Sequence, residues 1–334
     1  MLKPMLFAVL LFASSLLAQS GVPNATSRIP ELQTLAWKQY TESRYAEALA
    51  TCQELVPLVR DAFGPEHLEM AAALENEGVV LAALGRYREG EGALQRALTI
   101  RQKTLGPDHP DVAKTLNNLS ELFRSRGETG KAEPLIRKAL AIWEKNGQTL
   151  SPAYAGALNN LAESLSMGGR FQEAEAMFRR SAAILQSDGK PEGVELAVVE
   201  TNLAHIYRNQ KRFDEAESSF RTAGTICQRV LGPDHFTTVT VQLNMAELYL
   251  ATGRYKQAEP LIEAALNAYE KRLGAAHARY LNALGLYALL LKKTGRSKES
   301  NRVLADERRI RSENPIASSR PLTVDVHDLG KQRP

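Results

Sequence analysis

The sequence predicts an all-α fold, a solenoid of about seven helix-turn-helix repeats. Three observations lead to this prediction. A short phrase recurs at multiples of 42 residues, each period holds two apolar stripes with helical spacing, and small residues recur at fixed positions in both stripes. The composition agrees, because hydrophobic residues make up 44% and aromatic residues only 6% of the 334-residue chain. Such a composition favours closely packed helices over a large β-domain.

The recurring phrase is Gly-Pro-acid-His. It begins at Gly64, Gly106 and Gly232, and a degenerate form begins at Gly274, so the intervals are 42, 126 and 42 residues. An aromatic residue follows the turn of most units at the same phase. These aromatic residues are Tyr45, Tyr87, Phe171, Phe213 and Tyr255. Seven units therefore run over about residues 29–314.

Each unit reads as a helical hairpin. Residues 112–123 carry apolar side chains four, three and four apart, which places them on one stripe of a first helix. Gly127 ends this helix, and residues 132–140 carry a second apolar stripe. Small residues such as Gly78 and Gly90 occupy the positions where the two helices must approach closely. One hairpin cannot bury both of its stripes, so neighbouring hairpins must stack.

The N-terminus has the layout of a signal peptide. Lys3 precedes an apolar run over residues 5–17, and small and polar residues follow at 18–20. The run is shorter than the roughly 20 residues that span a bilayer, so no permanent membrane anchor is expected. We expect a signal peptide at 1–20, a short linker at 21–28, the repeat array at 29–314, and an extended or disordered tail at 315–334. The expected location is secreted or periplasmic.

The hairpin pattern resembles the tetratricopeptide repeat. The linker over residues 105–112 and the phrase over residues 116–119 (Leu-Asn-Asn-Leu) closely resemble the 42-residue kinesin-light-chain subtype, and the resemblance covers about 285 residues. It implies a right-handed superhelix whose first helices line a concave peptide-binding groove. The seventh unit departs from the pattern at Leu286, Ser300 and Glu307.

Several other functions are disfavoured. The 42 basic and 38 acidic residues are interleaved without a basic stripe, so nucleic acid is not an expected partner. No common hydrolase, zinc-protease or redox motif occurs, and the protein is not expected to be an enzyme or to hold a cofactor. The histidines of the recurring phrase, with equivalents in stacked repeats about 10 Å apart, are read as helix-entry residues and not as metal ligands. Cys52 and Cys227, about four repeats apart, are expected to be separate thiols.

The candidate binding residues lie on the first helices, opposite or beside their apolar stripe. An Asn recurs there every 42 residues, and an amide can both donate to and accept from a peptide backbone. The alternative is that these amides bridge adjacent helices, and the sequence favours neither. The candidate peptide-binding residues of the concave face are Asn76, Lys114, Asn117, Asn118, Glu121, Arg124, Asn159, Asn160, Glu163, Asn202, His205, Arg208, Asn209, Asn244 and Glu247.

These features predict a non-catalytic scaffold that binds a protein or an extended peptide on its concave face. A structural spacer or self-assembling subunit, which uses the convex or end surfaces, is the alternative. The sequence also leaves open whether the C-terminal tail docks in the groove.

Overall fold

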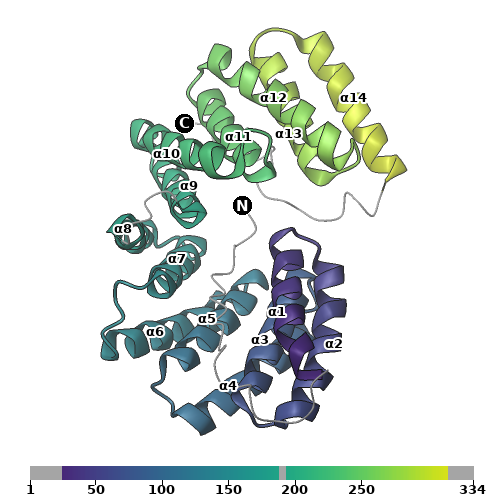
Figure 1. Cartoon of the computed structure of the whole chain (residues 1–334). Helices are drawn as coiled ribbons and strands as arrows, with labels where there is room; N and C mark the ends of the chain where they lie inside the picture. The colour runs from purple at the N-terminus through teal and green to yellow at the C-terminus, as the bar shows by residue number, and fades with distance from the viewer. Residues whose placement is uncertain (1–24, 188–192, 315–334) are drawn as a thin grey trace. The chain divides into compact units, whose positions relative to one another are not determined.

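The computed structural model describes residues 25–187 and 193–314, and this part of the chain forms fourteen α-helices and no strand (Figure 1). The predicted all-α solenoid of about seven helix-turn-helix repeats is therefore confirmed. The helices are α1 (Ala25–Thr41), α2 (Tyr45–Phe63), α3 (Leu68–Ala83), α4 (Tyr87–Leu105), α5 (Pro110–Ser125), α6 (Thr129–Lys145), α7 (Pro152–Met167), α8 (Phe171–Ser187), α9 (Val194–Asn209), α10 (Phe213–Leu231), α11 (Phe236–Ala251), α12 (Tyr255–Leu273), α13 (Ala278–Lys293) and α14 (Ser297–Glu313).

The predicted signal peptide at 1–20 and the predicted tail at 315–334 lie outside the described residues. Helix α1 begins at Ala25, inside the segment 21–28 that we expected to be a linker. Ile29 and Leu32 of this helix are buried in the core of the first two hairpins, and the helix continues for one further turn before them. At the other end, α14 stops at Glu313, close to the predicted end of the array at residue 314.

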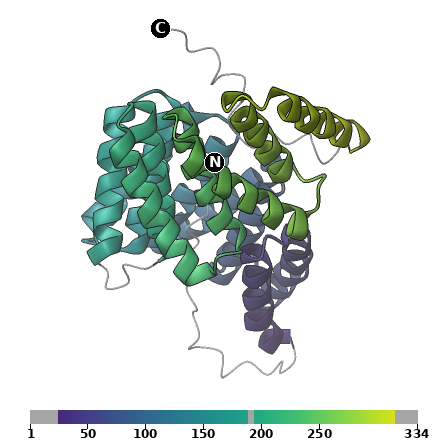
Figure 2. The same ribbon diagram turned by 90° about the horizontal axis from the view of Figure 1, so that it is seen from above.

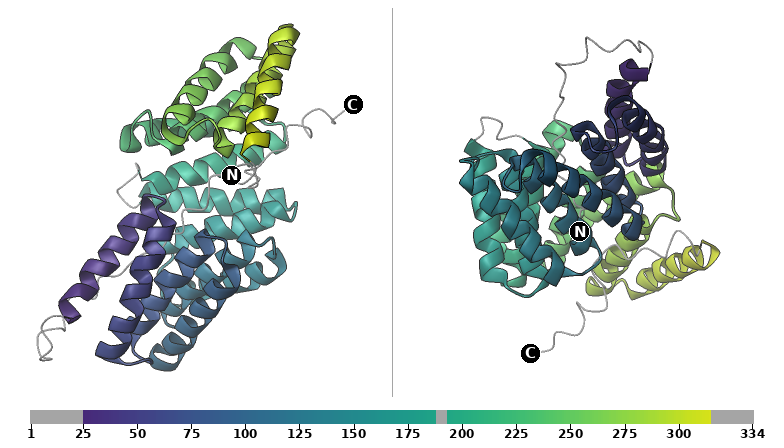
Figure 3. Two further views of the ribbon diagram at one scale, coloured as in Figure 1. Left: turned by 90° about the vertical axis from the view of Figure 1, so that its right-hand side faces the viewer. Right: turned by 90° about the horizontal axis from the view of Figure 1, so that it is seen from below.

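The chain divides into two compact units at Ile184 and Leu185. We call residues up to Ile184 the N-terminal unit and residues from Leu185 the C-terminal unit. Within each unit, the two helices of a hairpin pack against each other and each hairpin packs against the next, as with α3, α4 and α5, and with α11, α12 and α13 (Figures 2 and 3). Successive first helices also touch within a unit, as α5 does with α3 and α7.

The recurring phrase sets the boundary between hairpins. The side chains of His67, His109, His235 and His277 accept a hydrogen bond at Nδ1 from the backbone N–H two residues later, which caps the first helix. The preceding helix ends at a glycine in the left-handed region, as at Gly106 with φ of 87°. These contacts confirm the helix-entry role of the four histidines.

Small residues allow the helices of a hairpin to approach closely, as in repeat 2, the hairpin of α3 and α4. A Cβ atom added at Gly78 would lie 2.7 Å from Cγ of Leu94, and one added at Gly90 would lie 2.8 Å from the carbonyl oxygen of Gly78. Both distances are shorter than carbon and oxygen atoms tolerate. The two glycines are therefore required by the approach of α3 and α4, as the sequence indicated.

Both cysteines are free and buried in the structure, which confirms two separate thiols. Burial raises the pKa of the Cys52 thiol to about 12 and that of the Cys227 thiol to about 11. Such thiols stay protonated at neutral pH, so they serve as small apolar residues of the core.

Candidate functional site

The residues predicted to bind a ligand lie on the first helices, and the structure groups them by unit. We call this set of residues the first-helix face. In the N-terminal unit it comprises candidates on α3, α5 and α7, most of which are buried, and in the C-terminal unit candidates on α9 and α11. Each unit brings side chains of successive repeats into contact, because neighbouring first helices touch.

The amide row joins neighbouring repeats in the N-terminal unit. Nδ2 of Asn118 donates to Oε1 of Glu75 on the preceding first helix at 3.1 Å, and Nδ2 of Asn160 donates to Oδ1 of Asn117 at 3.1 Å. Both bonds span 43 residues, so each amide reaches the residue one position before its equivalent in the previous repeat. The bridging role is therefore present at these two positions, and it uses one donor of each amide.

The first amide of the row differs. Nδ2 of Asn76 is buried and has no hydrogen-bond partner among the described residues. A buried donor without an acceptor costs free energy.

Charged candidates of the N-terminal unit pair with one another. The Arg124 guanidinium binds Glu121 of its own helix through two nitrogens, at 2.9 and 2.5 Å, and binds Glu163 of α7 at 2.7 Å. Nδ2 of Asn159 donates to the same Glu163 at 2.9 Å. Lys114 pairs with Asp111 at 2.8 Å on α5. The charged candidates of this unit therefore form ion pairs with neighbouring side chains.

Glu121 is 2% exposed. This burial raises the pKa of the Glu121 carboxyl above its usual range, while the charge of Arg124 acts in the opposite direction. The ion pair with Arg124 therefore counteracts part of the effect of burial on this carboxyl.

One member of this network was not predicted from the sequence. Arg101 of α4 donates to both carboxylate oxygens of Glu75, at 2.7 and 2.8 Å, and also to the hydroxyl of Thr115 and the carbonyl oxygen of Asp111. It is 8% exposed. We call equivalent positions of successive repeats a column; the column of Arg101 holds the apolar residues Val59 and Trp143 in other repeats. A charge at such a core position needs a partner, so the sequence contained a sign of this contact.

The C-terminal unit has contacts of the same kind between α9 and α11. Arg208 of α9 pairs with Glu247 of α11 at 2.7 Å, and Asn244 approaches Nε2 of His205 at 3.5 Å. The His205 ring also packs edge-on against Phe220, with centroids 5.3 Å apart. Asn209 ends α9 and is exposed, whereas Asn202 is half-buried. This unit again places charges of opposite sign together across two repeats.

Two further findings concern other kinds of site. Among the described residues, no group of three or more His, Cys, Asp or Glu side chains is arranged to hold a metal ion. None of the helices from α1 to α14 combines the length and the apolar character needed to cross a membrane.

The architecture defines a class of helical-hairpin repeat proteins, and comparison with protein families is more specific. A tetratricopeptide repeat model matches residues 69–145, 126–187, 195–271 and 237–313. The matched segments cover more than half of the chain. The chain therefore belongs to the tetratricopeptide repeat family. No match was found among curated proteins.

Solved structures with the same fold include kinesin-light-chain-like proteins. A putative kinesin light chain of Podosopora anserina with nearly identical TPR-like repeats has a TM-score of 0.56 at 22% identity, over 62% of this chain and 98% of that one. BtubC (BKLC) from P. vanneervenii has a TM-score of 0.60 at 21% identity, over 73% and 96%. NprR in complex with its cognate peptide NprX has a TM-score of 0.59 at 15% identity, over 85% and 76%. At these identities the likeness establishes the fold.

Proposed function

We propose that this protein is a non-catalytic scaffold that binds an extended segment of a protein or peptide along its first-helix face. The observation that carries the proposal is the asparagine that recurs on successive first helices with the period of the repeat, in which Asn118 and Asn160 each use one amide donor to bridge neighbouring helices. An extended peptide presents carbonyl and N–H groups at regular intervals, and amides at regular intervals can bind them.

Two comparisons support the proposal. The tetratricopeptide repeat family, to which the chain belongs, is matched over most of the array, and no catalytic family is indicated. NprR, which shares the fold, is described in complex with a peptide. The fold by itself does not determine what is bound, so the ligand must be argued from the side chains.

The paired charges define the kind of segment that would bind. Because Arg124 is already held by Glu121 and Glu163, a ligand with one isolated charge would have to displace an internal partner. A segment with alternating polar and small side chains can instead form hydrogen bonds with the amide row. Nδ2 of Asn76 is a donor of this row that has no hydrogen-bond partner among the described residues.

A matched pair of lysine variants tests where the ligand binds. Peptides selected from a random library with residues 21–334 are titrated against Lys114→Ala, on first helix α5, and against Lys138→Ala, on the exposed surface of α6. Binding on the first-helix face predicts an affinity loss of about threefold or more for Lys114→Ala alone. Equal losses, or a loss for Lys138→Ala alone, would contradict the proposal.

We further propose that the chain is exported after removal of residues 1–20. The support is the charged, apolar and small-residue order of residues 3–20. N-terminal sequencing of the protein recovered outside the cytoplasm is expected to begin near residue 19 or 21. Recovery of intact Met1 in the membrane fraction would contradict this proposal.

A further inference from the structure

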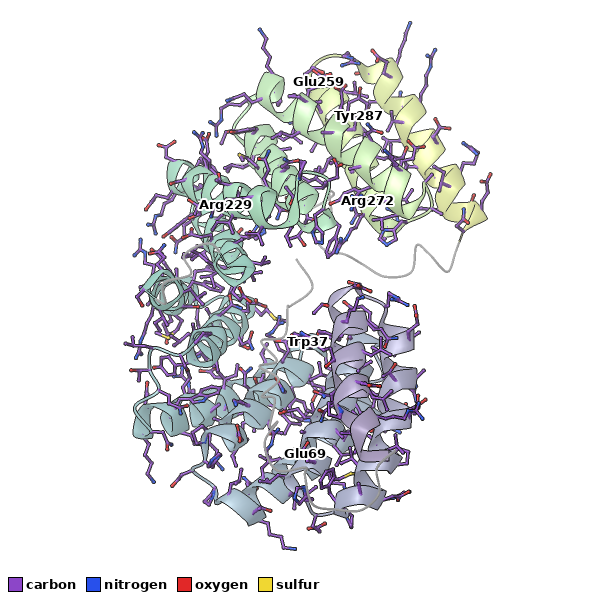
Figure 4. The ribbon with its side chains drawn as sticks, viewed as in Figure 1. Trp37, Glu69, Arg229, Glu259, Arg272 and Tyr287 are labelled. Carbon is purple, nitrogen blue, oxygen red and sulfur yellow. The ribbon has the colours of Figure 1, made fainter. Side chains whose placement is uncertain are left out.

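The C-terminal unit contains a pocket at the end of one hairpin, which we call the α11–α12 pocket. It lies where α11 begins and α12 ends, has a volume of about 350 Å³, and is mainly apolar. Arg272, which is labelled in Figure 4, belongs to its rim. The lining residues are Asp234, Phe236, Val239, Ala268, Tyr269, Arg272 and Leu273. None of them is a candidate of the first-helix face.

The hollow follows from an exchange of side-chain sizes that is specific to repeat 6. Repeats 2 to 5 have alanine in the column of Val239 and isoleucine in the column of Ala268. The alanines are Ala71, Ala113, Ala155 and Ala197, and the isoleucines are Ile100, Ile142, Ile184 and Ile226. All eight are buried. In repeat 6 the bulk moves to the first helix, and the pair has one carbon atom fewer. The space over Ala268 is therefore not filled by the side chain that fills it elsewhere.

The mouth of the pocket also differs from its equivalent in repeat 3. There Asn146 donates to the carbonyl oxygen of Asp108 at 2.9 Å, which ties the end of the second helix to the loop before the first. Arg272 takes the place of Asn146 in repeat 6 and is exposed. It makes no hydrogen bond or salt bridge with any residue that the structure describes.

Two guanidinium groups lie near the apolar wall of the pocket. The Arg279 guanidinium lies over the Phe236 ring, 4.8 Å from its centroid, and Arg272 stands on the rim beside it. Burial lowers the pKa of His235, and so do Arg272 and Arg279, so this histidine is neutral at neutral pH. Asp234 is the acidic residue of the lining.

We propose that the α11–α12 pocket binds a branched aliphatic carboxylate, with its apolar group over Ala268 and its carboxylate at Arg272. Val239 and Phe236 supply the apolar walls, and an arginine without an internal partner supplies the charge-assisted hydrogen bonds. The C-terminal residue of a peptide and a small free acid both have this chemistry. The pocket is separate from the first-helix face, so the inference does not depend on the proposed function.

Three probes and residues 21–334 test the inference by NMR titration: acetyl-Ala-Ala-Ile with a free carboxylate, the same tripeptide as its C-terminal amide, and 3-methylpentanoate. The free tripeptide is expected to bind about tenfold more tightly than its amide. A clear preference for the tripeptide over 3-methylpentanoate assigns the site to peptide C-termini, and equal binding assigns it to small acids. Equal binding of the tripeptide and its amide would overturn the role of the carboxylate.

Variants locate the binding. Arg272→Gln is expected to weaken the tripeptide about tenfold, while Lys271→Gln, the same change one residue earlier and outside the lining, leaves it unchanged. The double variant Val239→Ala with Ala268→Ile restores the pair of repeats 2 to 5 and is expected to abolish binding with the melting transition retained. Unchanged binding in the double variant, or equal losses in Arg272→Gln and Lys271→Gln, would overturn the proposal.

Discussion

Repeats 3 and 6 have the same backbone plan and different interiors. Their first helices, α5 and α11, each have 16 residues and begin after a capping histidine. Trp143 fills the end of the hairpin in repeat 3 and is 1% exposed. Tyr269 holds the equivalent position in repeat 6 and donates or accepts a 2.8 Å hydrogen bond with Thr240 beside an open pocket. A few repeat positions therefore maintain the period, while the others determine the chemistry.

The largest expected effect concerns the filled end of repeat 3. Trp143→Ala would open in repeat 3 a hollow like that of repeat 6, and we expect a loss of about 3 to 5 kcal/mol in the free energy of unfolding. Denaturant unfolding followed by circular dichroism measures it. Tyr269→Ala is the matched variant and should lose less, because its side chain already borders open space. A larger loss for Tyr269→Ala would contradict the difference that we draw between the two repeats.

The second prediction compares the charged pairs of the two units. Arg124→Ala leaves Glu121 buried without its cation, and the expected destabilisation is about 3 kcal/mol, at the lower end for broken buried pairs. Arg208→Ala should cost about 1 kcal/mol, because Arg208 and Glu247 are less buried and form a single contact. Chemical denaturation of both variants at pH 7 measures the two losses in the free energy of unfolding. Similar losses would contradict this prediction.

The same variant gives a pH dependence. The pKa of Glu121 in the folded protein lies above its unfolded value of about 4.3, and removal of Arg124 raises it further. A carboxyl with a raised folded-state pKa favours folding when it is protonated, so the penalty exists above that pKa and disappears as the pH falls through it. The destabilisation by Arg124→Ala should therefore be smaller at pH 5 than at pH 7. A larger destabilisation at pH 5 would show that Glu121 is not the affected group.

The amide row offers a smaller effect. Asn160→Ala removes one hydrogen bond between α5 and α7, and we expect a loss of about 1 kcal/mol together with a modest loss of ligand affinity. Asn244→Ala, whose contact with His205 is 3.5 Å long, should lose less stability. Melting temperature and affinity are measured for both. A drop in melting temperature with unchanged affinity would show that the row only bridges helices.

The smallest effect is expected at the thiols. Cys227 occupies in repeat 5 the column of Trp143 and Tyr269, and its pKa of about 11 keeps it protonated. Neither Cys227 nor Cys52 should react with iodoacetamide in the folded protein at pH 7.5, and both should react in denaturant. Mass spectrometry of the labelled chain provides the measurement. Rapid labelling of Cys227 alone would indicate that the core of repeat 5 opens as readily as the end of repeat 6.

The helices could be predicted from the sequence because their signals are local. The phrase at Gly232 and His235 contains both the end of α10 and the cap of α11, and each acts through backbone atoms within a few residues. The direction of the Asn118 amide was not predictable in this way. Its partner is Glu75, whereas the 42-residue period aligns Asn118 with Asn76. The side-chain rotamer decides whether the amide binds a neighbouring helix or a ligand, and the sequence does not determine that rotamer.

The pocket and the Arg101 network escaped sequence analysis for a different reason. Arg101 binds residues 26 and 14 positions away, and no periodic pattern links an arginine in one column with a glutamate in another. The hollow over Ala268 depends on the combined size of two facing side chains, those of Val239 and Ala268. Each residue alone is an ordinary apolar residue of a helix, so the exchange becomes visible only when the facing helix is known.

The histidine and glycine of the recurring phrase have a consequence for how such a chain can change in length. Each 42-residue unit that contains the phrase holds the stop signal of one helix and the start signal of the next, both made by its own atoms. A duplication of 42 residues therefore inserts one complete hairpin with intact ends, wherever in the unit the copied segment begins. A duplication whose length is not a multiple of 42 residues would leave a helix without its cap or its terminator. Gene duplication can thus lengthen this protein in whole steps, and each new copy is then free to acquire its own surface.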